Sequence, residues 1–416
     1  EKNKGKIVEF DETLIMEESN IIQLSPGALG GKGRGLSFIH TLIYNFDLSN
    51  YVHGISLKAP RTFIIGTQEF EDFLDNNRLR DKIISETSYE TIKRLFTRGK
   101  LSAALEKKLR IILGRITKPL AVRSSGLFED SLMQPFAGIF ETYLLPNINE
   151  DIEIRLQQLM DAVKLVYASI YSDTARSYIS AISYKIEEEK MAVIIQEVVG
   201  EQFENTYYPH ISGVSQSYNY YPYGYMQPED GFAVIAVGLG TYVVEGEKAF
   251  RFSPKYPNLE NNSPKDQFLN SQVELLAIDL DKKEFNLLEG DTVGLVRLSI
   301  DDAERHGVIN HCASVYSAEN KTIYPGIDKP GPRVINFADI LKYGYIPLAD
   351  SLVEILDIVK EALGTPVEIE FAIDLKKDSD YKASFYLLQI KPIIGASVDY
   401  DVNVDEIDKS HILLFT

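Results

Sequence analysis

Cysteine, long apolar runs and basic side chains are scarce in this sequence. The one cysteine in 416 residues, Cys312, excludes an internal disulfide framework and suits a reducing compartment. It lies in an apolar stretch, which indicates a buried thiol rather than a nucleophile. No stretch approaches the roughly 20 consecutive apolar residues of a membrane span, and the first 11 residues lack the charged-then-apolar form of a signal peptide. These absences predict a cytoplasmic protein with no membrane partner.

The shortage of basic residues also limits the partners that we expect. Lysine and arginine number 43 against 61 aspartates and glutamates, and the net charge of -18 opposes nonspecific attraction to nucleic acid. Tyrosines are frequent in residues 203–230, but no lysine or arginine lies between Gln202 and Asp230 to pair with them, as a base-stacking platform requires. We interpret the segment as a tyrosine-rich β-hairpin or insertion and expect no nucleic-acid partner.

The chain is long and apolar enough, with 44% hydrophobic residues, for more than one core. Apolar periodicity predicts helices over 152–170 and 349–363, and Met191–Gly200 reads as a nearly continuous apolar strand. Thr67 is expected to cap a helix.

The most informative stretch is residues 120–142. An apolar run that ends in Arg123 is followed by Ser124, Ser125 and a glycine, then by an acidic pair, a Pro-Phe-Ala-Gly turn and a second alternating run. This order predicts a strand, a polar loop and a second strand. A guanidinium, two hydroxyls and glycine-permitted backbone amides at the end of a strand are groups that bind a phosphate chain. The alternative is an ordinary turn with a surface arginine.

The chain divides, in our interpretation, at a charged run before residue 191. We place an N-terminal lobe at 1–190 and a C-terminal lobe at 191–416, with a helical insert over about 68–116. The insert either caps the phosphate loop or covers one face of a sheet as a spacer.

A second candidate phosphate site is the glycine-rich turn in residues 24–43. Glycines surround Lys32, and apolar residues then recur at helical spacing. Such a turn offers backbone amides to an anion where it opens a helix, and the lysine adds a mobile positive charge. The turn is not a Walker A loop, because Pro26 and Gly33 stand where that motif needs glycine and Ser or Thr. A flexible turn is the alternative.

Near the C-terminus, two alternating segments predict a hairpin with one polar face. Glu368 and Glu370 share a face of the first strand, and Gln389 and Lys391 share a face of the second. Two carboxylates and an amide on adjacent strands form an oxygen-rich site suited to magnesium, and the lysine can neutralise a terminal phosphate. The alternative is a half-exposed hairpin with a cross-strand Glu–Lys pair.

These segments, taken in order, resemble the nucleotide-binding domain of the phosphoenolpyruvate synthase and pyruvate phosphate dikinase family. That family has a Gly-Gly-Lys turn before a helix, a Val-Arg-Ser-Ser strand followed by an acidic pair, Phe-Ala-Gly and Glu-Thr, then a Gly-Leu-Gly segment and two strands that read Asp-Ile-Glu and Gln-x-Arg-Pro. The matching positions here are Gly30–Lys32, Val122–Ser125, Glu129 with Asp130, Phe136–Gly138, Glu141 with Thr142, Gly238–Gly240, Glu368–Glu370 and Gln389–Pro392.

The resemblance implies an α+β (α/β), ATP-grasp-like fold in which ATP binds between two lobes. Arg123 and Lys391 are the implied catalytic residues, and Gln196 and Val198 are candidates for the adenine pocket. ATP and magnesium are the implied cofactors. The implied nucleotide-binding set is Lys32, Arg123, Ser124, Gly138, Gln196, Val198, Gly240, Gln389 and Lys391, and the implied magnesium ligands are Glu368, Glu370 and Gln389.

Two positions depart from the family pattern. Thr241 replaces a glutamate that helps to hold the nucleotide in the family, so either recognition is altered or Glu245 or Glu247 substitutes. Lys391 replaces an arginine, which keeps the charge but loses the bidentate fork. Both departures favour the alternative of a nucleotide sensor that transfers no phosphate.

In the family, ATP phosphorylates a histidine on a separate mobile domain, which passes the group to pyruvate. The six histidines here lie outside the Gly-Gly, Thr-Ser-His setting of that residue, and there is no room for a TIM barrel of roughly 250 residues. The resemblance thus implies an ATP-dependent phosphotransferase (kinase or dikinase) domain that works with phosphohistidine and pyruvate/phosphoenolpyruvate-binding domains in the parent protein or in trans. The alternatives are a non-catalytic sensor or interaction module and a dikinase domain acting on another acceptor, as in glucan dikinases and rifampin phosphotransferases. A homodimer is left open.

Overall fold

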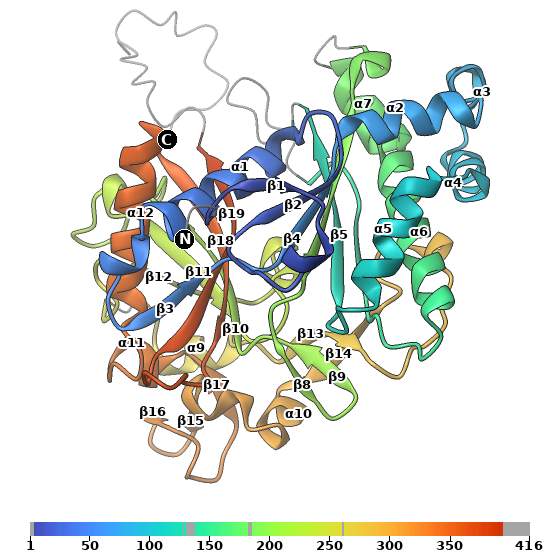
Figure 1. Cartoon of the computed structure of the whole chain (residues 1–416). Helices are drawn as coiled ribbons and strands as arrows, with labels where there is room; N and C mark the ends of the chain where they lie inside the picture. The colour runs from blue at the N-terminus through green and yellow to red at the C-terminus, as the bar shows by residue number, and fades with distance from the viewer. Residues whose placement is uncertain (1–3, 128, 130–137, 182–184, 260–261, 394–416) are drawn as a thin grey trace, which may run out of the picture.

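The computed structural model describes residues 4–127, 129, 138–181, 185–259 and 262–393. Strands in these residues form two six-stranded sheets and two smaller ones, with helices on their outer faces (Figure 1). The mixed α+β class predicted from the sequence is confirmed. No helix of the described residues is both long and apolar enough to cross a membrane.

The first six-stranded sheet combines strands from both sides of the predicted division. Strands β1, β2 and β4 run parallel, and the fully buried β7 pairs antiparallel with both β4 and β5. In sheet order the strands are β1 (Ile7–Glu9), β2 (Ile21–Ser25), β4 (Thr62–Ile65), β7 (Met191–Glu197), β5 (Leu120–Gly126) and β6 (Thr142–Leu145).

Helices cover the outer face of this sheet, on the right in Figure 1. The helical span predicted before the phosphate loop is helical, and its last two helices pack against the long α6. The helices are α2 (Thr67–Asn76), α3 (Arg80–Ser85), α4 (Tyr89–Arg98), α5 (Ala103–Leu113), α6 (Ile152–Ala168) and α7 (Asp173–Ala181).

The predicted cap of α2 is wrong by one residue. Gly66 occupies the N-cap position, where a Cβ would lie 2.3 Å from the carbonyl oxygen of Pro26, so a side chain does not fit there. The hydroxyl of Thr67 instead accepts a hydrogen bond from the backbone N–H of Ala28 at 3.0 Å. Thr67 therefore fixes the entry to the glycine-rich turn rather than the start of its own helix.

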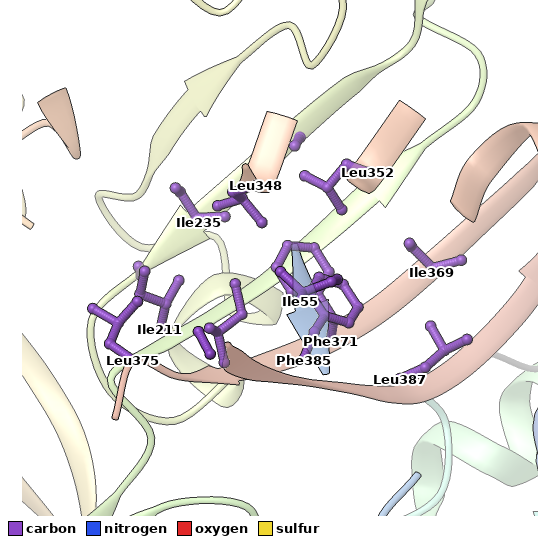
Figure 2. Close-up of a cluster of buried hydrophobic side chains, with 14 of the residues drawn as sticks. Ile55, Ile211, Ile235, Leu348, Leu352, Ile369, Phe371, Leu375, Phe385 and Leu387 are labelled. Atoms are coloured by element: carbon purple, nitrogen blue, oxygen red, sulfur yellow. The ribbon is translucent and has the colours of Figure 1, made fainter. Parts of the chain in front are cut away.

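The second six-stranded sheet packs against α12 (Leu348–Leu363), which ends at Gly364 as predicted. Figure 2 shows Leu348 and Leu352 of this helix above Phe371 and Phe385, whose rings stack with centroids 4.8 Å apart. The strands, in sheet order, are β12 (Phe250–Phe252), β11 (Phe232–Ala236), β10 (Ile211–Gln216), β18 (Val367–Asp374), β19 (Ala383–Pro392) and β3 (Ile55–Lys58).

The chain crosses between the two large sheets more than once. Strand β3 lies at the edge of the second sheet, and residues 59–61 carry the chain into β4 of the first. After β7 the chain leaves the first sheet again and reaches β10 of the second. The division into two lobes at residue 190 remains a prediction. It does not separate the two large sheets, because each sheet contains strands from both sides of residue 190.

The smaller sheets flank the second one. The tyrosine-rich segment is only partly the hairpin that we predicted, because its first tyrosines lie in β9 whereas residues 217–227 form no helix or strand. Cys312 is fully buried, and burial raises the pKa of its thiol, as expected of a structural cysteine. The two sheets comprise β14 (Leu295–Ser299), β13 (Glu274–Asp279), β9 (Thr206–Tyr208) and β8 (Glu201–Phe203), and β16 (Thr322–Pro325), β15 (Ala313–Ser317) and β17 (Arg333–Ile335).

Candidate nucleotide-binding site

A cavity of about 330 Å³ is lined by β5 and β7 of the first large sheet and by β10, β18 and β19 of the second. The short helix α8 (Thr241–Val244) and the loop before β14 complete its wall. Most of the site residues predicted from the sequence line this cavity, although they are up to 359 positions apart in the chain. They are Lys32, Arg123, Gly138, Gln196, Val198, Gly240, Glu370, Gln389 and Lys391.

The glycine-rich turn brings Lys32 to this cavity through very close backbone packing. It opens helix α1 (Gly30–His40), which packs against β5 of the first sheet and β19 of the second. A Cβ on Gly30 would lie 1.9 Å from the carbonyl oxygen of Ser125, and one on Gly31 would lie 1.4 Å from that of Glu129. The glycines are therefore required for the start of α1 to lie against the end of β5.

Lys32 is held in a buried polar cluster at the end of β5. Its ammonium forms an ion pair with the carboxylate of Glu129 and donates to the Ser124 hydroxyl at 3.2 Å. The Ser124 hydroxyl donates to the same carboxylate at 3.0 Å, and the backbone N–H of Gly126 donates to its other oxygen at 2.9 Å. Ser124 thus positions Lys32 and Glu129 and is not among the residues that line the cavity.

The motif that contains Glu129 does not reveal the role of its side chain. It is fully buried, and its contacts tie the glycine-rich turn to the predicted phosphate loop. The acidic pair in the sequence was the available signal. The other member, Asp130, and the Phe136 and Ala137 positions of the Phe-Ala-Gly match lie outside the described residues.

The predicted hairpin is present, and its register brings four polar side chains together. Glu370 pairs with Gln389 and Glu368 with Lys391 across β18 and β19. The Lys391 ammonium lies 2.5 Å from a Glu370 carboxylate oxygen and 3.5 Å from one of Glu368. From the first sheet, the Arg123 guanidinium donates to the amide oxygen of Gln389 and lies 3.6 Å from Glu370. The two large sheets therefore meet through charged groups at this point.

The electrostatics of this cluster keep Glu370 ionised. Burial alone raises the pKa of its carboxyl, but the positive charges of Lys391 and Arg123 outweigh burial and hold that pKa below its ordinary value. Gln216 on β10 donates to Glu368 at 2.6 Å and was not predicted as a site residue. Two carboxylates and the Gln389 amide oxygen form a donor set that could hold magnesium, which keeps several waters and needs few protein ligands. In the described ranges, this cluster included, no group of three or more histidine, cysteine, aspartate and glutamate side chains is placed to hold a metal ion, so the donor set here has only two carboxylates and an amide.

Many residues on the wall of the cavity are apolar, and local sequence pattern does not indicate most of them as site residues. The Val198 backbone is already engaged, since its N–H donates to Pro119 at 2.9 Å and its carbonyl accepts from the Tyr207 hydroxyl at 3.0 Å. The Gln196 amide donates to the Thr62 hydroxyl at 3.0 Å. An aromatic base in this cavity would meet mainly side chains, and the apolar ones on the wall include Phe140, Leu144, Val198, Leu239, Val244, Leu295, Phe371 and Leu388.

The substituted position, Thr241, also lines the cavity at the start of α8. Of the two glutamates that we considered as replacements, Glu245 lines the cavity, whereas Glu247 lies 3.4 Å from Arg297. Asp291 and Thr292 line the same wall and carried no signal in the sequence. Hydroxyl and carboxylate groups suited to a sugar are thus present beside Thr241.

A second cavity, of about 400 Å³, lies on the other side of the β7 exit and shares the wall 197–199. Its basic side chains are Arg61 and Lys118, and the Arg61 guanidinium is held by Glu197 at 2.7 Å and by Glu18 at 3.4 Å. Among the residues that the structure describes, no glycine-rich turn lines this second cavity. The first cavity is therefore the better place for a phosphate chain.

Comparison with known proteins identifies the family of the chain. The model of the pyruvate phosphate dikinase AMP/ATP-binding domain matches residues 27–411. A phosphoenolpyruvate synthase of Deinococcus radiodurans is 25% identical over 285 residues, which cover 63% of this chain and 33% of that protein. The uncharacterized phosphotransferase YvkC of Bacillus subtilis is 25% identical over 369 residues, 88% of this chain and 34% of its own length. A phosphoenolpyruvate synthase of Aeropyrum pernix is 25% identical over 368 residues, 81% of this chain and 38% of its own length.

The chain spans about a third of the length of these curated relatives. The family model covers nearly the whole chain, and the cavity that collects its motifs lies within the matched region. The chain belongs to the pyruvate phosphate dikinase AMP/ATP-binding domain family.

Proposed function

We propose that the cavity binds Mg-ATP and that the domain transfers a phosphoryl group from ATP to a histidine on a separate domain. The observation that carries this proposal is that Lys32, Arg123 and Lys391 line one cavity together with Glu370, Gln389 and many apolar side chains. Cations suit the phosphate chain, carboxylate and amide oxygens suit magnesium, and apolar walls suit adenine.

In this proposal the chain's own residues act by positioning and by neutralising charge. Lys32, Arg123 and Lys391 bind the phosphates, and Glu368, Glu370 and Gln389 would hold the magnesium, which would supply charge neutralisation at the phosphoryl group. A phosphorus–oxygen bond of the triphosphate breaks as the bond to the acceptor nitrogen forms, and the remaining nucleotide leaves with the bridging oxygen. Since both the nucleophile and pyruvate come from outside the described residues, this domain orients the donor and excludes water.

The partners follow from the size of the relatives. Two of those named above are phosphoenolpyruvate synthases about three times as long as the matched region. We infer that phosphohistidine and pyruvate/phosphoenolpyruvate-binding domains complete the reaction, in the parent protein or in trans, in the cytoplasm. A homodimer is left open, and light scattering would measure the oligomeric state of the chain.

Calorimetric titration with ATP, with and without magnesium, tests the site. Replacing Arg123 by alanine removes a side chain that is 15% exposed and reaches both Gln389 and Glu370. We expect affinity for Mg-ATP to fall roughly 10- to 100-fold, because a hydrogen bond to a charged group contributes about 1.5–3 kcal/mol. Arg94→Ala is the matched control, since Arg94 is exposed on α4. Unchanged affinity in Arg123→Ala contradicts the assignment.

A nucleotide sensor is the second candidate, favoured by the Thr241 and Lys391 departures. Both functions require magnesium-dependent ATP binding, so only transfer separates them. Incubation with γ-labelled ATP and a phosphohistidine domain from a relative would label that domain if the chain is a transferase. Tight Mg-ATP binding without any labelled acceptor would favour the sensor.

A further inference from the structure

The second cavity, of about 400 Å³, lies where the chain enters and leaves the first large sheet. Residues 59–61, which lead into β4, and residues 198–200, which follow β7, both line it. Asp374 at the end of β18 and Tyr386 on β19 add the second large sheet to its wall. A molecule held in this cavity would therefore contact both sheets without occupying the nucleotide cavity.

Carboxylates outnumber cations on the wall of this second cavity. Four carboxylates and two cations line it, which leaves a net charge of -2. The charged residues of the wall are Glu18, Arg61, Lys118, Glu197, Glu201 and Asp374. The Arg61 guanidinium is already neutralised, because it lies 2.7 Å from Glu197 and 3.4 Å from Glu18. Most of the unbalanced negative charge therefore belongs to the remaining carboxylates.

These remaining carboxylates, Glu201 and Asp374, have only weak cationic partners. Lys376 reaches Glu201 from outside the wall at 3.6 Å, but its side chain is 73% exposed, so water and salt screen the pair. The His210 imidazole lies 3.1 Å from Asp374 and adds a positive charge only when it is protonated. Both carboxylates can accept hydrogen bonds from a cationic ligand in the cavity.

Two tyrosines on the wall report the same negative potential. Burial raises the pKa of the Tyr207 and Tyr386 hydroxyls, and carboxylates of the wall raise both pKa values further. Aromatic rings also attract cations over their faces, and the Lys58 ammonium already lies 5.8 Å from the centre of the Tyr386 ring. A cleft lined by an excess of one charge concentrates the opposite charge. The second cavity therefore favours a positively charged ligand.

The spacing of the carboxylates favours an organic cation over a metal ion. Within the part of the chain that the structure describes, no three histidine, cysteine, aspartate or glutamate side chains are placed to hold one metal ion, so the acidic groups of this wall are spread out. An aliphatic diamine has an ammonium at each end and can reach two separated carboxylates. Its two charges equal the excess on the wall, and a cavity of this volume accommodates a small organic molecule.

The wall that the two cavities share gives such a ligand an influence on nucleotide binding. Residues 197–199 line both cavities. From the side of the second cavity, the Tyr207 hydroxyl donates to the Val198 carbonyl at 3.0 Å, and the Val198 N–H donates to Pro119 at 2.9 Å. A diamine beside Tyr207 would fix the exit of β7 against the second sheet. Because both also form walls of the nucleotide cavity, the two ligands would stabilise the same arrangement.

We propose that the second cavity binds an aliphatic diamine as its dication, with the ammonium groups at the carboxylates of the wall, and that the bound diamine strengthens the binding of Mg-ATP. The site itself does not depend on the proposed function. The coupling rests on the proposed function, because it requires Mg-ATP in the neighbouring cavity.

Calorimetric titration of the full chain without nucleotide tests the site. The three probes have the same four-carbon chain: butane-1,4-diamine carries two positive charges, 4-aminobutanoate one charge of each sign, and butanedioate two negative charges. We expect the diamine to bind at one site, at least about tenfold more tightly than the zwitterion, and the dianion not to bind. No binding of the diamine, or equal or tighter binding of either other probe, overturns the proposal.

A substitution on the wall separates this site from general attraction to an acidic protein. Glu201→Gln should lower the affinity for the diamine about tenfold, because it removes a carboxylate of the wall. Glu361→Gln, at an exposed position on α12, makes the same change in net charge and should have no effect. Equal losses in both variants would mean binding to the surface at large and would refute the site. Asp374→Asn provides a second test if melting curves show that Glu201→Gln is unfolded.

Titration of Mg-ATP with and without saturating diamine tests the coupling. The affinity of the unmodified chain should rise about threefold with diamine. Glu201→Gln should show no such rise, and it corrects for any complex of diamine and ATP in solution, since Glu201 does not line the nucleotide cavity. If Mg-ATP binds equally well with and without diamine, the proposed function stands and the coupling is wrong. If Mg-ATP does not bind at all, the proposed function and the coupling are both wrong, whereas the diamine titrations still decide the site.

Discussion

The buried pair of Lys32 and Glu129 gives a quantitative prediction about the frame of the site. The Lys32 side chain is 9% exposed and that of Glu129 is fully buried. Glu129 also accepts hydrogen bonds from the Ser124 hydroxyl and the Gly126 backbone. Replacing either charged partner alone strands the other charge in the interior, so the losses of stability in the two single variants should add up to more than the loss in the double variant.

The expected magnitudes follow from this burial. Lys32→Met and Glu129→Gln should each lower the free energy of unfolding by about 3–5 kcal/mol, the usual effect of breaking a buried ion pair from one side. In the double variant no charge is left without a partner. Its loss should therefore be smaller than the sum of the single losses by about 2–3 kcal/mol, at the upper end of measured coupling energies.

Urea denaturation followed by circular dichroism measures these values, since the chain has no tryptophan for fluorescence. The control pair is Lys283 and Glu150, which lie 3.1 Å apart with side chains 57% and 90% exposed. Lys283→Met should have no measurable effect. If the Lys32 and Glu129 effects add to within about 0.5 kcal/mol, the two side chains are independent and the reasoning is refuted.

Three further predictions concern other parts of the fold. Burial lowers the pKa of His40 from 6.5 to about 4. Because the unfolded chain takes up this proton at a higher pH than the folded chain, the free energy of unfolding keeps its full value above pH 6.5 and falls by about 3 kcal/mol by pH 4. The His40→Leu variant should lose less of its free energy of unfolding over that range, as measured by urea titrations. The exposed His53→Asn variant should lose as much as the unmodified chain. Phe371→Ala should cost about 3–5 kcal/mol in the same assay, as for other buried aromatics, and a loss below about 1 kcal/mol would contradict the packing in Figure 2. Gly31→Ala, whose Cβ would lie 1.4 Å from the Glu129 carbonyl oxygen, should lower the melting temperature and abolish Mg-ATP binding, and normal binding would show that the turn is looser than the structure indicates.

The parts of the site that the sequence predicted are those encoded by local pattern. Alternation along β18 and β19 placed Glu368 and Glu370 on one face and Gln389 and Lys391 opposite them, and the register agrees. A glycine-rich turn before apolar residues at helical spacing predicted α1 and the place of Lys32. Short-range periodicity was sufficient in both cases.

The contacts that were missed join residues far apart in the chain. Glu129 meets Lys32 across 97 positions, and Gln216 meets Glu368 across 152. No local pattern distinguishes a carboxylate or amide that will find such a contact from one that will face water. The apolar wall of the cavity was missed for the same reason, since Phe140 and Leu295 look like any other core residues until the two sheets are placed together.

The alternation of strands between the sheets has a consequence for dissecting the molecule. A fragment that ends near residue 190 would lack β7, leaving unpaired edges on β4 and β5, and would contain β3 without its neighbour β19. Exposed edges of this kind promote aggregation. Neither half is expected to fold alone, but two separately made halves, cut at the turn before β7, should reassemble when mixed, because each half supplies the strand that completes the other's sheet.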